Sequence, residues 1–198
     1  ESRKVGAVIV VLAEQDKVEM EDAINERIPD TKNTRIICRS GSPSDMTDLE
    51  IASPHSARSI IVLSEGEDPD TNVIKTILAI TNNPNRRSEP YHIVTQVRNQ
   101  QNLDVIKLLS ENDNVQPILT TDLIARVVAQ TSRQSGLSVV YTELMNFGGD
   151  EIYFKQEPNL SGKTYGDALL AYETSTVMGI RRSDGAIMMS PKMDTRIE

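Results

Sequence analysis

Two acidic residues directly follow the first strongly apolar run of the chain. The run ends at Ala13, and Glu14 and Asp16 come next, before a charged stretch. In a nucleotide-binding α/β fold, an acidic side chain at the end of a strand accepts hydrogen bonds from a ribose, which makes Glu14 a candidate for ligand binding. The alternative is that both acids favour the positive N-terminus of the following helix. The residues alone leave both interpretations open.

A second candidate site is the turn over residues 39–43. Arg39, Gly41 and Ser42 follow another apolar run. In a parallel sheet, ligands bind at the carboxyl ends of the strands. Gly41 permits a tight turn, the Ser42 hydroxyl can donate a hydrogen bond, and the Arg39 guanidinium can pair with a phosphate. An ordinary turn from a strand to a helix explains the same residues equally well.

Oxygen-bearing side chains alternate at Asp68, Asp70 and Asn72, a spacing that occurs in calcium-binding loops. Pro69 interrupts this pattern, and no glutamate follows at the position that such a loop requires. A helix N-terminus, where acids cap backbone N–H groups and favour the dipole, is the better explanation. We therefore predict a helix whose start is marked by Asp70, and no metal site.

The other reactive side chains do not form a catalytic set. His55 and His92 are far apart and lack a zinc-binding spacing, and Cys38 lies inside an apolar run, so we expect all three to be structural. The sequence has no G-x-S-x-G motif, no Walker loop and no two glycines two residues apart, which excludes the G-x-G dinucleotide fingerprint. We predict that the chain is not an enzyme.

An alternation of strands and helices positions the candidate residues. Apolar, β-branched runs predict parallel strands buried on both faces, and amphipathic stretches between them predict helices. The expected strands are 5–13, 35–39, 59–63, 92–97 and 116–119, and the expected helices are 16–27, 44–52, 71–82 and 102–111. This order predicts an α/β fold over residues 1–120, with right-handed βαβ units in one Rossmann-like parallel sheet flanked by helices.

Residues 121–147 are expected to form two connecting helices. Thr121 or Asp122 would cap a long helix that runs to residue 134 and stops at Gly136, and a shorter helix would span 139–146. Their apolar side chains exceed what a lone surface helix needs, so we predict that they dock neighbouring domains. Covering the sheet and the next lobe would explain them equally well. The residues are Leu123, Ile124, Val127, Val128, Val139, Val140 and Leu144.

The pattern changes from residue 148 onward. Strand-like runs cover 151–156, 177–181 and 186–190, separated by glycine-containing turns such as 183–185. They predict a small α+β lobe over 148–198, which we expect to be truncated. Because the chain begins with Glu1 and ends at Glu198 within a strand-like run, we interpret it as a fragment of a longer protein.

The composition is that of a soluble globular protein. The 198 residues include 29 acidic and 21 basic side chains and have a net charge of -8, which argues against nucleic acid as a partner. A single cysteine excludes an internal disulfide and fits a reducing compartment. No apolar run approaches the roughly 20 residues needed to cross a bilayer, so any membrane part lies elsewhere.

Several stretches resemble the RCK/TrkA-N (KTN) regulatory domains, which gate potassium channels and transporters. VVLAEQDKVEM (10–20) resembles their second strand, acidic ribose position and following helix, and HIVTQVRNQQN (92–102) resembles a later strand that ends in an arginine. LSGKTYGDALLAYETSTVMGIRRSDGAIMMSP (160–191) is similar to their TrkA-C lobe. Within this superfamily, ICRSGSP (37–43), HSARSIIVL (55–63), DLIAR (122–126) and QTSRQSGLSVVY (130–141) are similar to the CASTOR/POLLUX group of ion channels.

This resemblance implies a fold and a function. The first strand of the Rossmann sheet and its glycine loop would be missing from the chain, and Ser42 stands where the family usually has an acid. The implied function is a ligand- or ion-sensing domain that gates a potassium or other cation channel by rearranging an oligomeric ring. The implied ligand-binding residues are Glu14, Arg39, Gly41, Ser42, Asn72 and Arg98.

The resemblance also implies ligands, partners and a location. The ligand would be NAD, another adenine nucleotide, or a divalent or monovalent cation. The partners would be other copies of the domain and a covalently attached membrane pore outside these residues, with this segment on the cytosolic side of a membrane protein. Two alternatives stay open, namely an NAD-binding fragment of an oxidoreductase and an oligomerisation scaffold that binds no ligand.

Overall fold

The computed structural model describes residues 6–63, 66–109, 111–146 and 151–198. Contacts between residues group the chain into two units, Glu1–Gln134 and Ser135–Glu198. The predicted finer division at residues 120 and 147 stays a prediction. Among the described residues, no helix is both long enough and apolar enough to cross a membrane.

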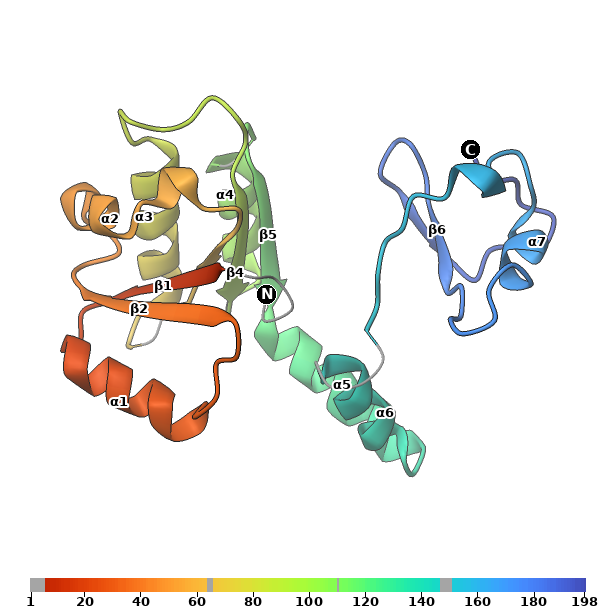
Figure 1. Ribbon diagram of the computed structural model, residues 1–198, viewed down its shortest axis with the longest axis horizontal. Helices are drawn as coiled ribbons and strands as arrows, with labels where there is room; N and C mark the ends of the chain where they lie inside the picture. Colours follow the sequence, from red (N-terminus) through yellow and green to blue (C-terminus); the bar gives the residue numbers. More distant parts are fainter. Residues whose placement is uncertain (1–5, 64–65, 110, 147–150) are drawn as a thin grey trace. The chain divides into compact units, whose positions relative to one another are not determined.

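The first unit begins with a pair of parallel strands, β1 (Ala7–Ala13) and β2 (Thr34–Ser40), in which Ala7 lies opposite Thr34 and Ala13 opposite Ser40. Helix α1 (Lys17–Arg27) connects them and packs on β2 (Figure 1). The Asp16 carboxylate caps α1 by accepting hydrogen bonds from the backbone N–H groups of Val18 and Glu19. The capping interpretation is therefore confirmed for Asp16.

The second set of parallel strands comprises β3 (Ile60–Val62), β4 (His92–Val97) and β5 (Asn114–Leu119), with β4 in the middle. Helices α3 (Pro69–Thr81) and α4 (Gln101–Leu109) are the crossovers between these strands and pack on them. Helix α2 (Met46–Ala52) and the short 3-10 helix η1 (Pro54–Ser56) lead from β2 to β3 (Figure 1).

The predicted α/β fold with parallel strands and flanking helices is confirmed, but the strands form two ladders instead of one sheet. In the common doubly wound order, a further strand lies between the counterparts of β1 and β3. We expected β1 and β3 to be buried on both faces, and this is wrong, since Val8 is 54% and Ile61 69% exposed. Each of these strands pairs along only one edge in its ladder, which leaves part of its apolar surface uncovered.

The core of the first unit is centred on α3. Val73, Ile77 and Ile80 recur at helical spacing on one face of α3 and are almost completely buried. They belong to the same cluster as Ile93 and Val97 of β4. The other buried members are Leu49, Val62, Ala79, Tyr91 and Ile106. The alternating burial of β4 and the helical spacing on α3 thus meet in one contiguous core.

The start of α3 differs from the prediction by two residues. Pro69 occupies the first turn, and Asp68 is the N-cap, whose carboxylate accepts a hydrogen bond of 3.4 Å from the Thr71 N–H. Asp70 is therefore not the cap that we expected. Proline favours the first helical position because its missing N–H would lack a partner there in any case.

Helix α5 (Thr120–Arg133) follows β5 without an intervening loop, and Leu119 at its N-cap makes no capping hydrogen bond with its side chain. The predicted cap by Thr121 or Asp122 is wrong. The Thr121 hydroxyl instead donates to the carbonyl oxygen of Arg98 at 2.9 Å, and the Asp122 carboxylate pairs with Arg126 at 2.6 Å. Tertiary and side-chain bonds have taken the place of a cap.

The second unit contains α6 (Leu137–Met145), the 3-10 helix η2 (Pro158–Leu160), α7 (Tyr165–Leu169) and an antiparallel pair, β6 (Gly179–Arg181) with β7 (Ile187–Met189). The predicted turn at 183–185 is confirmed, because Gly185 has a φ of 86° and its N–H donates to the Arg182 carbonyl. The predicted strand over 151–156 is wrong. This segment joins no ladder among the described residues, and a strand forms only as part of a ladder.

Backbone hydrogen bonds hold the second unit together around α7. The N–H groups of Tyr165 and Gly166 donate to the carbonyls of Thr195 and Met193, and the Ile197 N–H donates back to Lys163. Tyr165 is buried, and its hydroxyl donates to the Val177 carbonyl at 3.1 Å. The small core is completed by Leu160 and Ala168.

The first prediction concerns the core around α3. Ile77 is 0% exposed, so the substitution Ile77→Ala leaves a cavity and should lower the free energy of unfolding by about 2–5 kcal/mol. Urea denaturation followed by circular dichroism measures this change. Leu108→Ala, on the exposed face of α4, is the matched control and should change stability by no more than about 0.5 kcal/mol. Equal midpoints for the two variants would contradict this core.

Candidate ligand site at the carboxyl ends of the strands

The parallel pairing of β1 and β2 brings four of the predicted site residues to one edge. The Gly41 N–H donates to the Ala13 carbonyl at 3.0 Å, and the Ser40 hydroxyl donates to the Gln15 carbonyl at 2.7 Å. Glu14 lies between these two contacts in the chain. The group that we call the β1–β2 edge consists of Glu14, Arg39, Gly41 and Ser42.

The turn at Gly41 is shaped by Asp48 of α2. The Asp48 carboxylate accepts a hydrogen bond of 2.8 Å from the Ser42 N–H, and a Cβ added to Gly41 would lie 3.1 Å from the Asp48 side chain. Glycine therefore fits the close approach of α2. Sequence reasoning missed Asp48. The signal that could have found it is the Asp45-x-x-Asp48 spacing, which resembles the N-terminal pattern of a capped helix.

The start of α2 is fixed by a second carboxylate. Asp45 accepts hydrogen bonds from the N–H groups of Asp48 and Thr47, and these bonds hold the pKa of the Asp45 carboxyl below its usual range. The Ser42 and Ser44 hydroxyls lie 3.1 Å apart in the same turn. The polar atoms of this turn mostly serve the turn itself, in agreement with the structural interpretation of residues 39–43.

Arg39 and Cys38 are held by the strand. The Arg39 guanidinium donates to the carbonyl oxygen of Cys38 at 3.0 Å. Cys38 is buried as expected, and this burial, with the nearby charge of Glu21, raises the pKa of its thiol. A raised pKa means less thiolate, which argues against a nucleophilic role.

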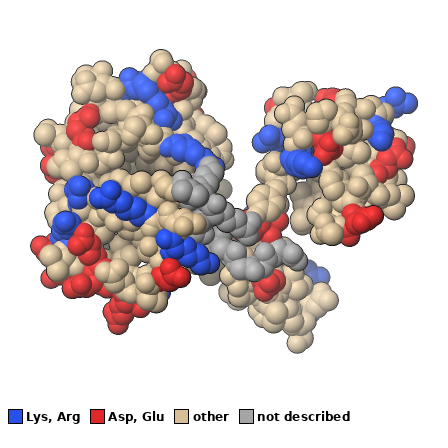
Figure 2. Space-filling view, in the orientation of Figure 1, with Lys and Arg blue, Asp and Glu red and all other residues tan. Residues whose placement is uncertain are grey.

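Charge at the β1–β2 edge has mixed sign. Exposed acidic side chains gather over α1, which starts beside Glu14 (Figure 2), and they include Glu19, Asp22 and Glu26. Arg39 is the basic residue among the predicted site residues of this edge. The surroundings of Glu14 therefore favour a cation, whereas Arg39 favours an anion.

A buried carboxylate organises the carboxyl end of β4. Asp70 accepts hydrogen bonds from the Arg98 N–H at 2.9 Å, the Asn99 N–H at 2.9 Å and the Asn102 side-chain amide at 2.8 Å. Burial acts to raise the pKa of Asp70, but these hydrogen bonds outweigh it and the pKa is lowered. The carboxylate is therefore ionised and already bonded to protein donors, which does not suit a calcium ligand.

Both backbone polar groups of Arg98, the N–H and the carbonyl, are hydrogen-bonded. Its N–H donates to Asp70, and its carbonyl accepts from Thr121 of α5. The Arg98 side chain is exposed, as is that of Asn72 on the first turn of α3. The structure thus places the predicted residues Asn72 and Arg98 around Asp70, whose clamping role sequence reasoning missed because it depends on a loop 28 residues away.

The six predicted ligand residues therefore fall into two groups on separate ladders, and their role in binding stays a prediction. Within the part of the chain that is described, no three or more His, Cys, Asp or Glu side chains are grouped so that they could hold a metal ion. His55 and His92 lie near the start of β4, at the opposite ends of the strands from these groups, and both hydrogen-bond to protein side chains.

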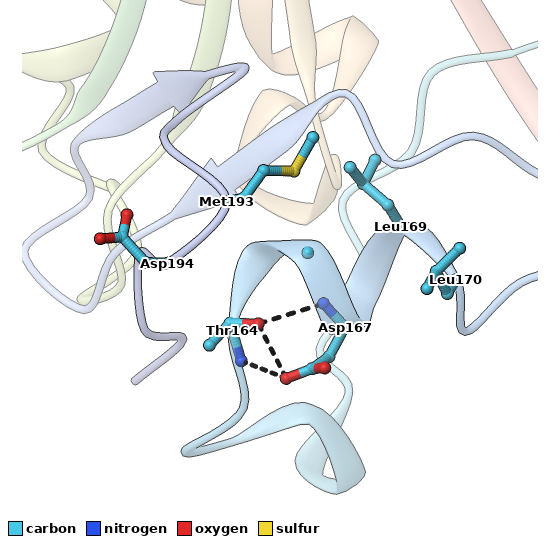
Figure 3. A pocket seen from close by; sticks show the side chains of 7 residues that line it. Thr164, Asp167, Leu169, Leu170, Met193 and Asp194 are labelled. Atoms are coloured by element: carbon cyan, nitrogen blue, oxygen red, sulfur yellow. Dashed lines mark hydrogen bonds between the residues drawn. The ribbon is translucent and has the colours of Figure 1, made fainter.

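A hollow in the second unit contains none of the predicted residues. It has a volume of ≈ 520 Å³, and Leu169, Leu170 and Met193 supply its apolar lining (Figure 3). The Asp167 carboxylate on its rim accepts hydrogen bonds from the N–H and hydroxyl of Thr164. Its main polar pair is thus used as the cap of α7, and the hollow offers an apolar surface instead of a polar ligand site.

Comparison with known proteins indicates the family that this chain resembles, which the geometry of the site does not reveal. The family described as "Castor and Pollux, part of voltage-gated ion channel" matches residues 121–198. The probable ion channel CASTOR of Oryza sativa subsp. japonica is 35% identical over 191 residues, which cover 94% of this chain and 21% of that protein. The chain is similar to the CASTOR and POLLUX ion channels over nearly its whole length. The resemblance drawn from short stretches of sequence is thereby confirmed.

Other CASTOR and POLLUX proteins match to a similar extent. The ion channel CASTOR of Lotus japonicus is 34% identical and covers 94% of this chain, and the probable ion channel POLLUX of Arabidopsis thaliana is 32% identical and covers 96%. The chain spans 22% and 23% of the length of these two relatives. The chain therefore aligns with one segment of each of these longer relatives.

A solved structure supports the fold. The human SLO3 gating ring matches 99% of this chain and 39% of its own, with a TM-score of 0.64 and a sequence identity of 19%. At this identity the match shows that the chain has the fold of a gating-ring segment.

The second prediction tests the clamp at the end of β4. In Asp70→Asn an amide –NH2 replaces one acceptor oxygen, which leaves a buried N–H unsatisfied and should lower the free energy of unfolding by about 1–3 kcal/mol. Urea denaturation measures the loss. Asp68→Asn is the matched control and should be nearly neutral, because asparagine is also a good N-cap.

The contribution of the Asp70 carboxylate to the free energy of unfolding should depend on pH. Because the folded-state pKa of Asp70 is lowered, its contribution is present above the unfolded value of about 3.9 and is lost as the pH falls through the folded value. The stability difference between the wild type and Asp70→Asn should therefore shrink below about pH 4. A difference that is constant down to the acid transition would contradict the clamp.

Proposed function

We propose that this chain is the cytosolic regulatory domain of a cation channel and that it acts by a rearrangement of an oligomeric ring rather than by catalysis. The observation that carries this proposal is the similarity to CASTOR and POLLUX ion channels over 94–96% of the chain. The fold shared with a gating ring supports it. A ligand or ion shifts such an assembly only through a difference in its affinity for two arrangements.

Helix α5 supports assembly with other copies. None of its described residues is buried. Its apolar residues Ile124 and Val128, one turn apart, are 63% and 62% exposed. Leu123 adds a further exposed apolar side chain, and Val127 is half-buried. An amphipathic helix whose apolar side faces water is a docking element, since that surface is stabilised when it is covered.

Helix α6, in the second unit, has the same character. It has no buried residue among those described, and its exposed apolar side chains are Val139, Val140, Leu144 and Met145. We propose that α5 and α6 both contact neighbouring copies of the domain in a ring. The predicted interface residues on the two helices are the ones that carry this surface.

The end of β4 offers a route from a ligand to α5. Asp70 holds the Arg98 N–H, and Thr121 on the first turn of α5 holds the Arg98 carbonyl. A ligand that binds the exposed Arg98 side chain would shift the Arg98–Asn99 peptide, whose N–H donates to Asp70 of α3 and whose carbonyl accepts from Thr121 of α5. The proposed mechanism is that this shift changes the orientation of α5 at the interface between copies.

The open edges of β1 and β3 support a further strand in the intact protein. Val8, Ile9 and Val10 on β1 and Ile61 on β3 are exposed apolar residues next to ladder edges that pair with no other described strand. One parallel strand inserted between them would join both ladders in the doubly wound order and cover these side chains. The turn after such a strand would complete a ligand site with Glu14 and Arg39.

The third prediction tests assembly through α5. The double substitution Ile124→Glu and Val128→Glu places two charges on the proposed interface and should convert the associated chain to a monomer, because burying unpaired charge is unfavourable. Light scattering after size exclusion measures the mass. Val18→Glu on α1, where valine is similarly exposed, should leave the mass unchanged. A monomeric wild type at all concentrations would contradict the interface.

The fourth prediction tests gating in the intact channel that contains this segment. The same double substitution on α5 should alter the open probability measured by electrical recording, with the permeating ion and the surface amount of channel unchanged. An oligomerisation scaffold without a sensing role would instead lose assembled channel at the membrane. Unaltered gating in a fully assembled channel would refute the regulatory role.

The fifth prediction concerns ligands at the carboxyl ends. Calorimetric titration with NAD⁺, ADP, Ca²⁺ and K⁺ should detect binding of at least one, and Arg98→Ala should weaken binding of an anionic ligand by about tenfold, the effect of losing one charge-assisted hydrogen bond. Arg133→Ala at the end of α5 is the control. Turnover of a substrate with NAD⁺ would favour the oxidoreductase alternative. No detectable binding of any of the four ligands would favour the oligomerisation scaffold.

A further inference from the structure

A buried tyrosine occupies the amino ends of the central strands, opposite the candidate ligand site. Tyr91, directly before β4, is 0% exposed, and its N–H donates to the Asp113 carboxylate at 2.8 Å. The guanidinium groups of Arg86 and Arg87 lie 5.5 Å and 4.7 Å from the centre of its ring. This arrangement fixes the phenol ring within the loop 83–91.

The two arginines attach this loop to its surroundings. Arg87 donates to the carbonyl of Ala57, just after η1, at 2.8 Å. Arg86 donates to the Thr81 carbonyl at the end of α3 and to the Asp113 carboxylate. The loop therefore links η1, α3 and the residues before β5 through hydrogen bonds.

The Tyr91 hydroxyl is part of a directed chain of hydrogen bonds. His55 of η1 contacts the Tyr91 hydroxyl through Nδ1 and the Glu50 carboxylate through Nε2, at 3.1 Å. The hydrogen bond from His55, with a smaller one from Asn83, lowers the pKa of Glu50, so this carboxylate is ionised and can only accept. Nε2 must therefore carry a proton.

The remaining directions follow from that proton. In a neutral imidazole, a protonated Nε2 leaves Nδ1 as an acceptor, so the Tyr91 hydroxyl must donate to it. The hydroxyl oxygen accepts in turn from the Arg87 N–H, at 3.3 Å. The chain thus runs from the Arg87 amide through Tyr91 and His55 to Glu50, with every step satisfied only while the His55 ring is neutral.

A second proton on the ring would disrupt this order. It would place an N–H on Nδ1 against the hydroxyl hydrogen of Tyr91, so the bond between His55 and Tyr91 must be given up or reversed. A reversed bond would leave the hydroxyl hydrogen of the buried Tyr91 without its acceptor. The charged ring would be attracted by Glu50 of α2, which is partly exposed and therefore screened. It would be repelled by Arg86 and Arg87 on the loop side.

The other charged groups near this cluster act less directly. Asp113 is already bonded to Arg86 and to the Tyr91 backbone, so its charge is offset. Arg58 follows η1 in the chain and Glu89 lies within the loop, where its carbonyl accepts from Arg87. His92 adjoins Tyr91 but contacts Asn114. Glu50 is therefore the charge in direct contact with the ring, and it is retained in both protonation states.

We propose that protonation of His55 breaks the hydrogen bond chain at Tyr91 and loosens the loop 83–91 from η1. The contact between the loop 83–91 and η1, at the amino ends of β3, β4 and β5, would therefore depend on pH. We call this contact the latch. Histidine is the side chain whose unperturbed charge change falls between about pH 5 and pH 8. The latch is independent of the ligand site at the other ends of the strands.

Amide hydrogen exchange measured by NMR tests the latch in the whole 198-residue chain. After correction for the intrinsic pH dependence of exchange, protection of the Arg87 amide should fall by about tenfold between about pH 8 and about pH 5.5, the effect of losing one partly buried hydrogen bond. In His55→Gln, which cannot titrate, protection should not depend on pH. His92→Gln removes the other histidine of the chain and should keep the full response.

Ring nitrogen shifts of the wild type provide a second readout that does not depend on a variant that folds. At about pH 8, His55 should be the Nε2–H tautomer, and its titration should coincide with a shift of the Arg87 amide. The Nδ1–H tautomer, equal protection of Arg87 at both pH values, or a pH response retained in His55→Gln would each overturn the proposal.

Discussion

The ionised carboxylate of Asp70 is the interaction on which the first unit depends most. One side chain at the start of α3 satisfies two backbone N–H groups at the end of β4 and the side chain of Asn102 on α4. It therefore sets the position of both crossover helices against the central strand. Thr121 extends the same set of bonds to α5, so the path from strand to helix is continuous across one peptide.

The elements of the fold could be predicted where the signal is local. The helical spacing of Val73, Ile77 and Ile80 predicts α3, and it does so because one face of this helix is buried as the spacing requires. The exposure of β1 and the lack of a ladder at 151–156 among the described residues could not be predicted, because both depend on whether a neighbouring strand is present. The residues around Ile152 have a high preference for the strand conformation, but they form a strand only when a neighbouring strand pairs with them.

The candidate site shows the same division. The ends of strands could be located from the sequence, and four of the six predicted residues meet at the β1–β2 edge because parallel pairing demands it. Asp48 and Asp70 could not be assigned their roles in this way. Their partners are backbone N–H groups brought near by tertiary folding, and a backbone group has no residue type that a sequence pattern could reveal.

The exposed apolar side of α5 has a consequence for cooperativity. A helix of 14 residues without a buried side chain has little stability of its own, because in proteins most helical stability comes from packing. In a separate copy, this helix would open locally far more often than the core around α3. In the proposed assembly, the ordering of α5 and the joining of copies would be a single step, so part of the interaction energy between copies would be spent on conformational entropy and the association would be reversible.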